Sequence, residues 1–267
     1  MKLSISNIAW RKEENKKIIK LLKFYGFNTI EVAPTLLFEN IEKISSFEIK
    51  KVKKFWKENE IDIVAFQSLL FGKYDFNIFL SNQRIILDYL KKIFEIGYNL
   101  GVKVAVFGSP KNRLKKNLSF SEAKKIACDF FYKLAEIGKN NDITIALEPN
   151  PKEYGADFIV NTNEALDFIK YVNHPYLRLN LDSGILTLNK EGLEKNIEKS
   201  LPYLAHFHIS QPYLNPVGKS NVDHLKIASL LKKNKYSFYC SIEMKAQSEN
   251  NLLNVKNALE FVKEIYG

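Results

Sequence analysis

The sequence is poor in cysteine and has no long apolar run. Only Cys128 and Cys240 occur among its 267 residues, and both lie in segments with apolar periodicity. They are therefore expected to be reduced, buried thiols, which excludes a disulfide-stabilised scaffold. No apolar stretch is long enough to span a bilayer, and no secretory signal stands at the start. These absences predict a cytoplasmic protein with no membrane partner.

The sequence also lacks any segment that would divide it into domains. It contains no Pro-, Gly- or Ser-rich linker and no low-complexity tract. Its apolar fraction of 46% is sufficient for a sizeable core. Its length is close to that of one eight-stranded α/β barrel. We expect residues 1–267 to form a single domain.

Basic residues are in excess, with 40 Lys and Arg against 30 Asp and Glu and a net charge of +10. The lysines are spread over every helical segment, beside Glu and Asn, and form no single dense block. This pattern is typical of a solvated surface rather than a nucleic-acid interface, so we predict no nucleic-acid partner.

Strand and helix signals alternate eight times along the chain. The expected strands are 2–6, 28–32, 61–66, 102–107, 143–147, 177–181, 204–208 and 238–242. The expected helices lie near 13–24, 47–59, 80–99, 119–140, 162–171, 190–200, 221–234 and 250–265. Eight such units with right-handed crossovers predict a parallel (β/α)8 TIM barrel.

Four long connections follow strands, at 67–79, 107–118, 148–161 and 209–220. Each would therefore lie at the C-terminal rim of the barrel, where such barrels carry their active sites.

Each of the last four expected strands ends at a residue type that binds metals: Glu148, Asp182, His208 and Glu243. Side chains alternate faces along a strand, and all four residues fall on the face opposite the apolar one. That shared face is the barrel interior. The pattern predicts one divalent ion held at the interior mouth.

Three carboxylates and one imidazole form a mostly hard donor set, which suits Mn²⁺, Mg²⁺ or Co²⁺ better than a structural zinc. Open coordination positions would accept two neighbouring substrate oxygens, and the ion would acidify the adjacent C–H. Glu148 and Glu243, on opposite sides of the ion, would then be the catalytic pair that deprotonates one carbon and reprotonates it or its neighbour through an enediolate.

At these residues the chain resembles the xylose isomerase-like barrels, specifically the sugar (or sugar phosphate) isomerase and epimerase branch that includes the ketose 3-epimerases. The family order of metal ligands matches Glu148, Asp182, His208 and Glu243, and the resemblance covers essentially the whole chain. It implies a divalent-metal-dependent isomerase or epimerase of carbohydrate metabolism. Its substrate would be a small sugar or sugar phosphate, and a homodimer would be common among its relatives.

Further segments similar to the family lie in or near the rim loops and supply candidate substrate-binding residues. Lys111 and Arg113 would bind a phosphate or acidic group, or form a solvated loop pair. Glu31 faces inward and would contact a substrate hydroxyl or pair with Arg178. The remaining candidates are Trp10, Gln67, Asn150 and Lys245.

Two positions depart from the ketose 3-epimerases. A substrate-binding His three residues after the metal Asp is Ile185 here, and an Arg six residues after the metal His is Leu214. These departures favour a different substrate head, such as a phosphorylated, nucleotide-linked or carboxylated one. His224 is a candidate replacement imidazole, and His206 is expected to pack or to support the site from behind.

Three other functions compete with this interpretation. A dehydratase would use the same scaffold, because an enediolate can expel a β-hydroxyl, and a non-catalytic barrel would bind a sugar without turning it over. A DNA-repair endonuclease would need a three-zinc cluster with histidines on earlier strands. The chain has four histidines, and the first of them is His174, so this cluster cannot be assembled and the sequence disfavours this function.

Overall fold

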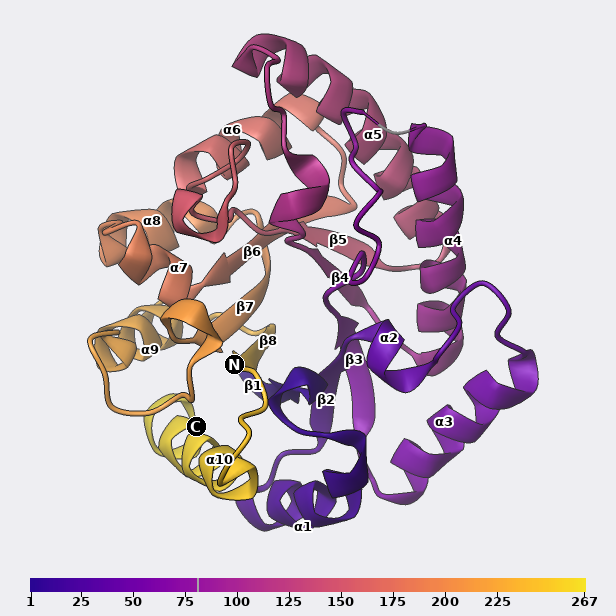
Figure 1. The fold of residues 1–267 in the computed structure, drawn as a ribbon. Coiled ribbons are helices and arrows are strands. Elements are labelled where there is room, and N and C mark those ends of the chain that lie inside the picture. The colour runs from indigo at the N-terminus through magenta and orange to yellow at the C-terminus, as the bar shows by residue number, and fades with distance from the viewer. Residues whose placement is uncertain (81) are drawn as a thin grey trace.

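The computed structural model describes residues 1–80 and 82–267. Eight parallel strands form a closed barrel in chain order, and helices surround it (Figure 1). The predicted (β/α)8 barrel is confirmed. The strands are β1 Lys2–Ser6, β2 Thr29–Val32, β3 Asp62–Phe66, β4 Val104–Phe107, β5 Thr144–Leu147, β6 Leu177–Asp182, β7 Leu204–Ser210 and β8 Tyr239–Glu243.

Ten α-helices occur in the described part of the chain. They are α1 Asn15–Tyr25, α2 Pro34–Leu37, α3 Ser46–Glu58, α4 Gln83–Leu100, α5 Phe120–Asn140, α6 Thr162–Val172, α7 Ser183–Leu188, α8 Leu193–Ser200, α9 His224–Lys233 and α10 Asn251–Tyr266. Short 3-10 turns are η1 Asn7–Ala9, η2 Lys12–Glu14, η3 Pro110–Arg113, η4 Lys152–Tyr154 and η5 Pro212–Leu214. Residue 81, within the predicted helix 80–99, lies outside the described residues. None of the described helices has the length and apolar character to span a membrane.

Local sequence signals set several helix boundaries. Ser119 caps α5 by accepting a hydrogen bond from the Glu122 amide, and Asn161 caps α6 in the same way. Gly101 ends α4 in the left-handed conformation at φ 98°, where a side chain would be strained. These residues fix where each helix begins or ends.

The structure differs from the predicted elements around the site. The short helices α2 and α7 were not predicted, and β7 extends to Ser210 rather than ending at 208. Helix α7 starts directly after β6, with Asp182 as its N-cap. A helix of six residues has too little apolar periodicity to be distinguished from a turn.

The two faces of the strands form different layers. Outward apolar side chains such as Ile145, Leu179 and Phe207 are fully buried in the main core between the barrel and its helices. Cys240 is buried in the same layer, as predicted, whereas Cys128 is only half-buried on α5; both thiols are free. The prediction of two buried thiols is therefore correct for Cys240 alone.

The barrel interior changes character around its circumference. A small apolar cluster of Val64, Ala65, Val104, Val106, Ala146 and Ala205 fills one part. Polar side chains that are fully buried occupy positions on other strands, among them Ser4, Glu31, Asn180, His206 and Ser241. The strand pairing shifts register next to two of these polar residues, at Ile30/Glu31 between β2 and β3 and at Leu179/Asn180 between β6 and β7. Such irregularities re-aim side chains near functional sites.

Candidate metal and substrate site

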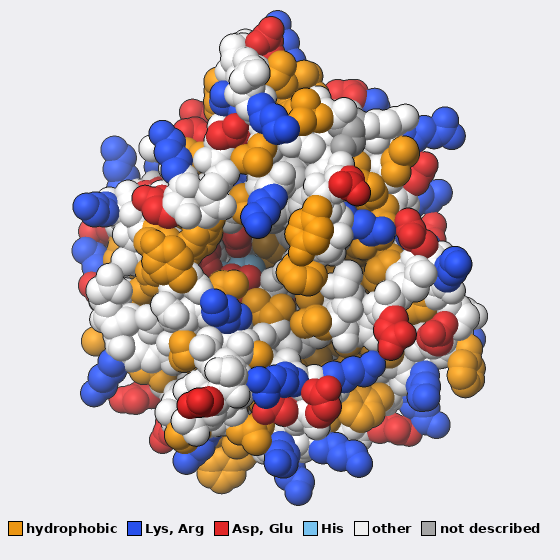
Figure 2. All heavy atoms as spheres, in the orientation of Figure 1, with side chains coloured by type: hydrophobic (Ala, Val, Ile, Leu, Met, Phe, Trp, Pro, Cys, Tyr) orange, Lys and Arg blue, Asp and Glu red, His pale blue; other side chains and the backbone are white. Residues whose placement is uncertain are grey.

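Four predicted side chains meet at the C-terminal mouth of the barrel. Glu148 follows β5, Asp182 ends β6, His208 lies on β7 and Glu243 ends β8. Each offers one ligand atom, and these atoms all lie within 4.8 Å of one another. All four side chains are buried, yet they line a pocket of about 170 Å³. Figure 2 shows acidic and histidine side chains at the bottom of a hollow near the centre of this face.

The imidazole of His208 is the centre of the group. Its Nδ1 lies 3.0 Å from Glu148 Oε2, 3.1 Å from Glu243 Oε2 and 4.0 Å from Asp182 Oδ2. Three carboxylates therefore converge on one nitrogen at distances that a single cation could bridge. The prediction that these residues come together is confirmed, and this buried cluster could hold one metal ion.

Glu148 is held in place by two amides. Asn150 Nδ2 donates to its Oε1 at 2.8 Å, and Asn180 Nδ2 donates to its Oε2 at 2.7 Å. A Cβ at Gly108 would lie 2.9 Å from Glu148 Oε1, so the absence of a side chain there leaves room for the carboxylate. The orientation of Glu148 is thus fixed before any substrate arrives.

Asp182 is both a candidate metal ligand and the N-cap of α7. Its Oδ1 accepts a hydrogen bond of 2.6 Å from the Ile185 amide at the start of α7. The following turn packs tightly against β7, because a Cβ at Gly184 would lie 2.7 Å from the Gln211 carbonyl carbon. The residues Ser183 and Gly184 therefore form the start of α7, with Asp182 as its N-cap.

Burial and mutual repulsion govern the charges of the group. Burial, with Glu148 and Glu243 nearby, raises the pKa of Asp182 to about 8. Burial likewise raises the pKa of Glu243, although His208 opposes this. Burial alone would lower the pKa of His208, but Glu243 and Glu31 raise it well above its usual value. Without a cation, protons balance the negative charge, which is the behaviour of a site whose donor set fits a divalent ion.

Arg113 does not point into the pocket as a phosphate ligand would. It is fully buried, and it donates to the carbonyl oxygens of Gly108, Phe158, Ile159 and Glu148 and to Asn150 Oδ1. Burial lowers its pKa to about 10, so it stays charged at neutral pH. The predicted substrate contact is corrected: Arg113 ties the loops after β4 and β5 together, because its donors are already used.

Three other predicted substrate residues are not brought to the pocket. Trp10 donates its indole N–H to Asn15 Oδ1 at 2.8 Å and lies in a different cavity. Lys111 and Lys245 are exposed and do not line the pocket. Gln67 and Asn150 do line it.

His224 does not replace the missing family histidine. It is buried against α10, where its Nδ1 lies 2.8 Å from the Tyr266 hydroxyl. Arg178 likewise does not pair with Glu31, since it donates to the Pro202 carbonyl instead. The sequence could not exclude either contact, because neither strand parity for Arg178 nor the start of a helix at His224 gives the direction in which the side chain extends.

The two positions that depart from the ketose 3-epimerases do line the pocket. Ile185 is buried, and Leu214 is half-buried with a left-handed backbone at φ 57°, directly after Tyr213 at φ 64°. Such a conformation costs about 1–2 kcal/mol for each side-chain-bearing residue. The Lys245 amide stabilises it by donating to the Leu214 carbonyl at 3.0 Å.

Sequence reasoning missed Tyr154, which lines the pocket, and Asn180, which holds Glu148. Tyr154, on η4, lines the pocket, and its hydroxyl oxygen accepts a hydrogen bond of 2.8 Å from the Tyr213 amide. No periodic signal marks a loop residue of this kind. Asn180, which holds Glu148, could have been found because it shares the inward face with Asp182 two residues later.

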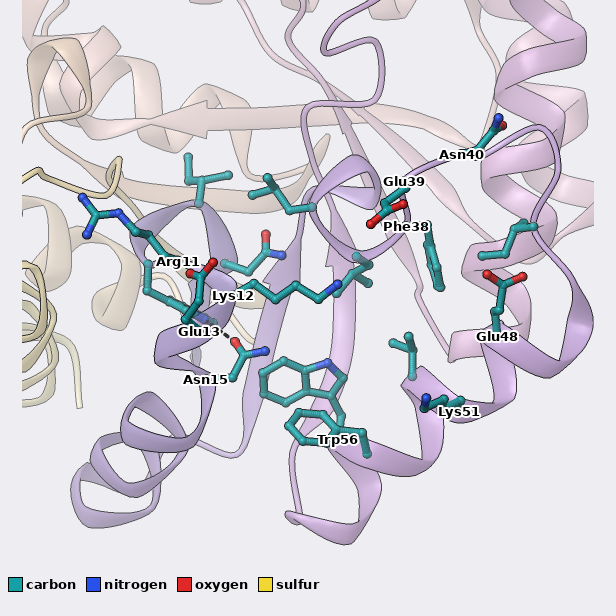
Figure 3. A pocket seen from close by; sticks show the side chains of 18 of the residues that line it. Arg11, Lys12, Glu13, Asn15, Phe38, Glu39, Asn40, Glu48, Lys51 and Trp56 are labelled. Atoms are coloured by element: carbon teal, nitrogen blue, oxygen red, sulfur yellow. Dashed lines mark hydrogen bonds between the residues drawn. The ribbon is translucent and has the colours of Figure 1, made fainter.

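A much larger cavity lies apart from this pocket. It has a volume of about 1030 Å³ and lies between η2, α2 and α3, with Trp56 at its base (Figure 3). We call it the aromatic groove, after its ring-bearing residues Trp10, Phe38, Phe55 and Trp56. Its charged residues are exposed and of both signs, so it offers no converging ligand group of the kind seen around His208.

The sequence profile of the xylose isomerase-like TIM barrel family matches residues 19–265, almost the whole chain. The chain belongs to this family. No curated protein matches the chain significantly by sequence.

Solved structures share the barrel over its full length. D-psicose 3-epimerase from Clostridium cellulolyticum H10, solved with D-tagatose, superposes with a TM-score of 0.82 at 16% identity, covering 100% of this chain and 99% of that one. An Escherichia coli 3-keto-D-glucoside 4-epimerase gives 0.80 at 19% identity, covering 99% of each chain. The IOLI protein, solved with a zinc atom, gives 0.75 at 18% identity, covering 100% of this chain and 98% of that one. At these low identities, the superpositions establish that this chain shares its fold with those proteins.

Proposed function

We propose that this xylose isomerase-like barrel is a divalent-metal-dependent sugar isomerase or epimerase. The observation that carries the proposal is the placement of two glutamates, at 3.0 and 3.1 Å, beside one buried histidine nitrogen at the base of a small pocket. The similarity to structures of sugar epimerases supports the same class of reaction.

Glu148, Asp182, His208 and Glu243 would hold the ion. The donor set of three carboxylates and one imidazole favours Mn²⁺, Mg²⁺ or Co²⁺. When bound, such an ion supplies Lewis acidity toward a substrate carbonyl, which makes the neighbouring C–H more acidic.

Proton transfer falls to the two glutamates. Glu148, fixed by Asn150 and Asn180, is oriented to take a proton from a substrate carbon. Glu243 comes from the opposite side of Asp182 and His208 in the strand order and can return a proton to the same carbon or to its neighbour. The first outcome is epimerisation, and the second interconverts an aldose and a ketose.

The charges of the pocket favour an uncharged sugar over a sugar phosphate. The ionisable residues lining it, apart from Tyr154, are the three carboxylates and His208, and no lysine or arginine is among the described lining residues. Even with a bound dication, three carboxylates would leave the pocket without a partner for a phosphate dianion. Tyr154, Gln67 and Asn150 offer hydrogen-bonding groups for hydroxyls.

Solvent isotope exchange tests the proposal. Protein loaded with Mn²⁺ or Co²⁺ is incubated in D₂O with matched pairs of free sugars and their phosphates, and deuterium at carbon is measured by NMR. We expect exchange with at least one free sugar, and its loss in Glu148→Gln and in Glu243→Gln. Absence of exchange with every sugar, although an ion is bound, would contradict the proposal and leave a sugar-binding role. Loss of water from the substrate would identify a dehydratase.

A further inference from the structure

A second buried group lies directly behind the candidate metal ligands. Glu31, on β2, is fully buried, and its Oε1 lies 3.2 Å from His208 Nε2 and 3.3 Å from His206 Nε2. Glu31 does not line the substrate pocket. Its contact with the site therefore passes through His208.

The environment of Glu31 gives its carboxylate few other partners. Its Oε2 is buried with no hydrogen-bond partner among the described residues, and no lysine or arginine pairs with it there. A buried carboxylate of this kind is costly unless a donor or cation compensates it. The Nε2 of His208 lies within hydrogen-bonding distance of Glu31 Oε1 and can supply the donor, whereas His206 Nε2, at 3.3 Å, makes no hydrogen bond within the described part of the chain.

The two nitrogens of His208 face different groups. Its Nδ1 faces Glu148 and Glu243, where the ion would bind, and its Nε2 faces Glu31. A neutral imidazole carries one N–H, and a nitrogen that binds a metal must be bare. Nδ1 can therefore act as a ligand when the proton is on Nε2 and is donated to Glu31.

We infer that Glu31 is a positioning residue that holds His208 in the Nε2–H tautomer and fixes its ring angle, so that Nδ1 is presented to the ion. This inference rests on the proposed metal site. Asn180 adds a second restraint, since its Nδ2 lies 3.2 Å from His208 Nδ1 while it donates to Glu148. Asn180 thus limits how far the ring can turn from Glu148.

A second ion is the competing arrangement. Glu31, His206 and His208 also offer ligand atoms within 4.8 Å of one another. With both sites filled, both nitrogens of His208 would bind metal, and neither would carry a proton. The number of ions bound per chain separates this arrangement from a positioning role.

Co²⁺ titration of Glu31→Ala and Glu31→Gln tests the inference. We expect one ion per wild-type chain and about 10–100-fold weaker binding in Glu31→Ala, with an altered ligand-field spectrum. Glu31→Gln keeps an oxygen that can accept from Nε2–H, so it should bind with intermediate affinity even if the alanine variant folds poorly. Glu136→Gln is the matched control, because Glu136 Oε1 lies 2.7 Å from His174 Nε2 outside the barrel; it should bind Co²⁺ like the wild type.

Histidine tautomers provide a readout that a loss of packing would not mimic. In Zn²⁺-loaded protein with ¹⁵N-labelled histidine, NMR should show His208 protonated at Nε2. The chemical shift of this Nε2 proton should differ between the wild type and Glu31→Gln. Wild-type affinity and an unshifted Nε2 proton in both variants would overturn the inference, as would two ions per wild-type chain with one lost in Glu31→Ala. A wild-type protein that binds no ion would overturn the proposed metal site as well.

Discussion

The two hollows on the rim differ in size and in chemistry, and the smaller one carries the candidate site. The aromatic groove is about 1030 Å³, whereas the pocket around His208 is about 170 Å³. In the groove, charged side chains of both signs, such as Lys12 and Glu39, are exposed to solvent. In the pocket, three carboxylates are buried together beside one imidazole. A functional site is recognised by ionisable groups that are buried together, and the volume of a cavity is a poor guide to it.

The same contrast runs along the strands. The ends of β1 to β4 carry Ser6, Val32, Phe66 and Phe107, while β5 to β8 lead to carboxylates and a histidine. Both halves share the parallel barrel topology, but the four candidate ligands all come from β5 to β8. The first half contributes supporting groups, such as Glu31 behind His208.

The largest expected effect is on turnover. Glu148→Gln and Glu243→Gln should each lower kcat by about 10²–10⁴, because each removes a proton-transfer group. Lys12→Gln and Glu39→Gln in the aromatic groove should change kcat by less than about threefold, since solvated charges contribute little. Steady-state kinetics on the sugar found by isotope exchange measures both sets. If kcat fell equally in the groove variants, the functional contrast between the groove and the pocket would be contradicted.

Arg113 should matter more for stability than for binding. Arg113→Ala leaves the carbonyl oxygens of Gly108, Phe158 and Glu148 buried without their donor, so the free energy of unfolding should fall by at least about 3 kcal/mol. Arg11→Ala is the control: Arg11 is exposed, although it donates to the Gln247 carbonyl, and the change should stay within about 0.5 kcal/mol. Urea denaturation measures both. A fully stable Arg113→Ala would contradict the role assigned to the guanidinium.

Metal affinity should depend on pH in the pocket. The ion must displace protons from Asp182, whose pKa is raised to about 8, and from His208, whose pKa is also raised. Each displaced proton should weaken binding by about tenfold for each pH unit below 8, so the two together should weaken it by up to about ten-thousandfold at pH 6. Calorimetric titration with Co²⁺ at constant ionic strength measures this, and pH-independent affinity between 6 and 8 would contradict it.

The metal-free protein should show the opposite trend in stability. The folded pKa of Asp182, about 8, lies above the 3.8 of an unperturbed carboxyl, so the folded state keeps its proton longer than the unfolded chain does. The contribution of Asp182 to stability is present below pH 4 and is lost as the pH rises toward 8.

The smallest expected effect concerns the turn after β6. Gly184→Ala would place a methyl group 2.7 Å from the Gln211 backbone, so the free energy of unfolding should fall by about 1–3 kcal/mol and metal affinity should weaken through Asp182. Gly218→Ala is the control, because nothing lies within 4 Å of its added Cβ. Thermal denaturation and Co²⁺ titration of both variants test this. A Gly184→Ala variant with wild-type stability and wild-type Co²⁺ affinity would show that the turn can shift to accommodate the methyl group.

The sequence by itself determined the barrel, its strand order and the meeting of Glu148, Asp182, His208 and Glu243. These follow from local periodicity, because a closed parallel barrel brings every inward strand end to one mouth. Only the tertiary structure decided that Arg113 faces carbonyl oxygens, that Glu31 lies behind His208 and that Trp10 lies in the aromatic groove. Long side chains can reach several partners from one backbone position. Which partner they meet depends on neighbouring strands and loops that are distant in sequence, so no local pattern records it.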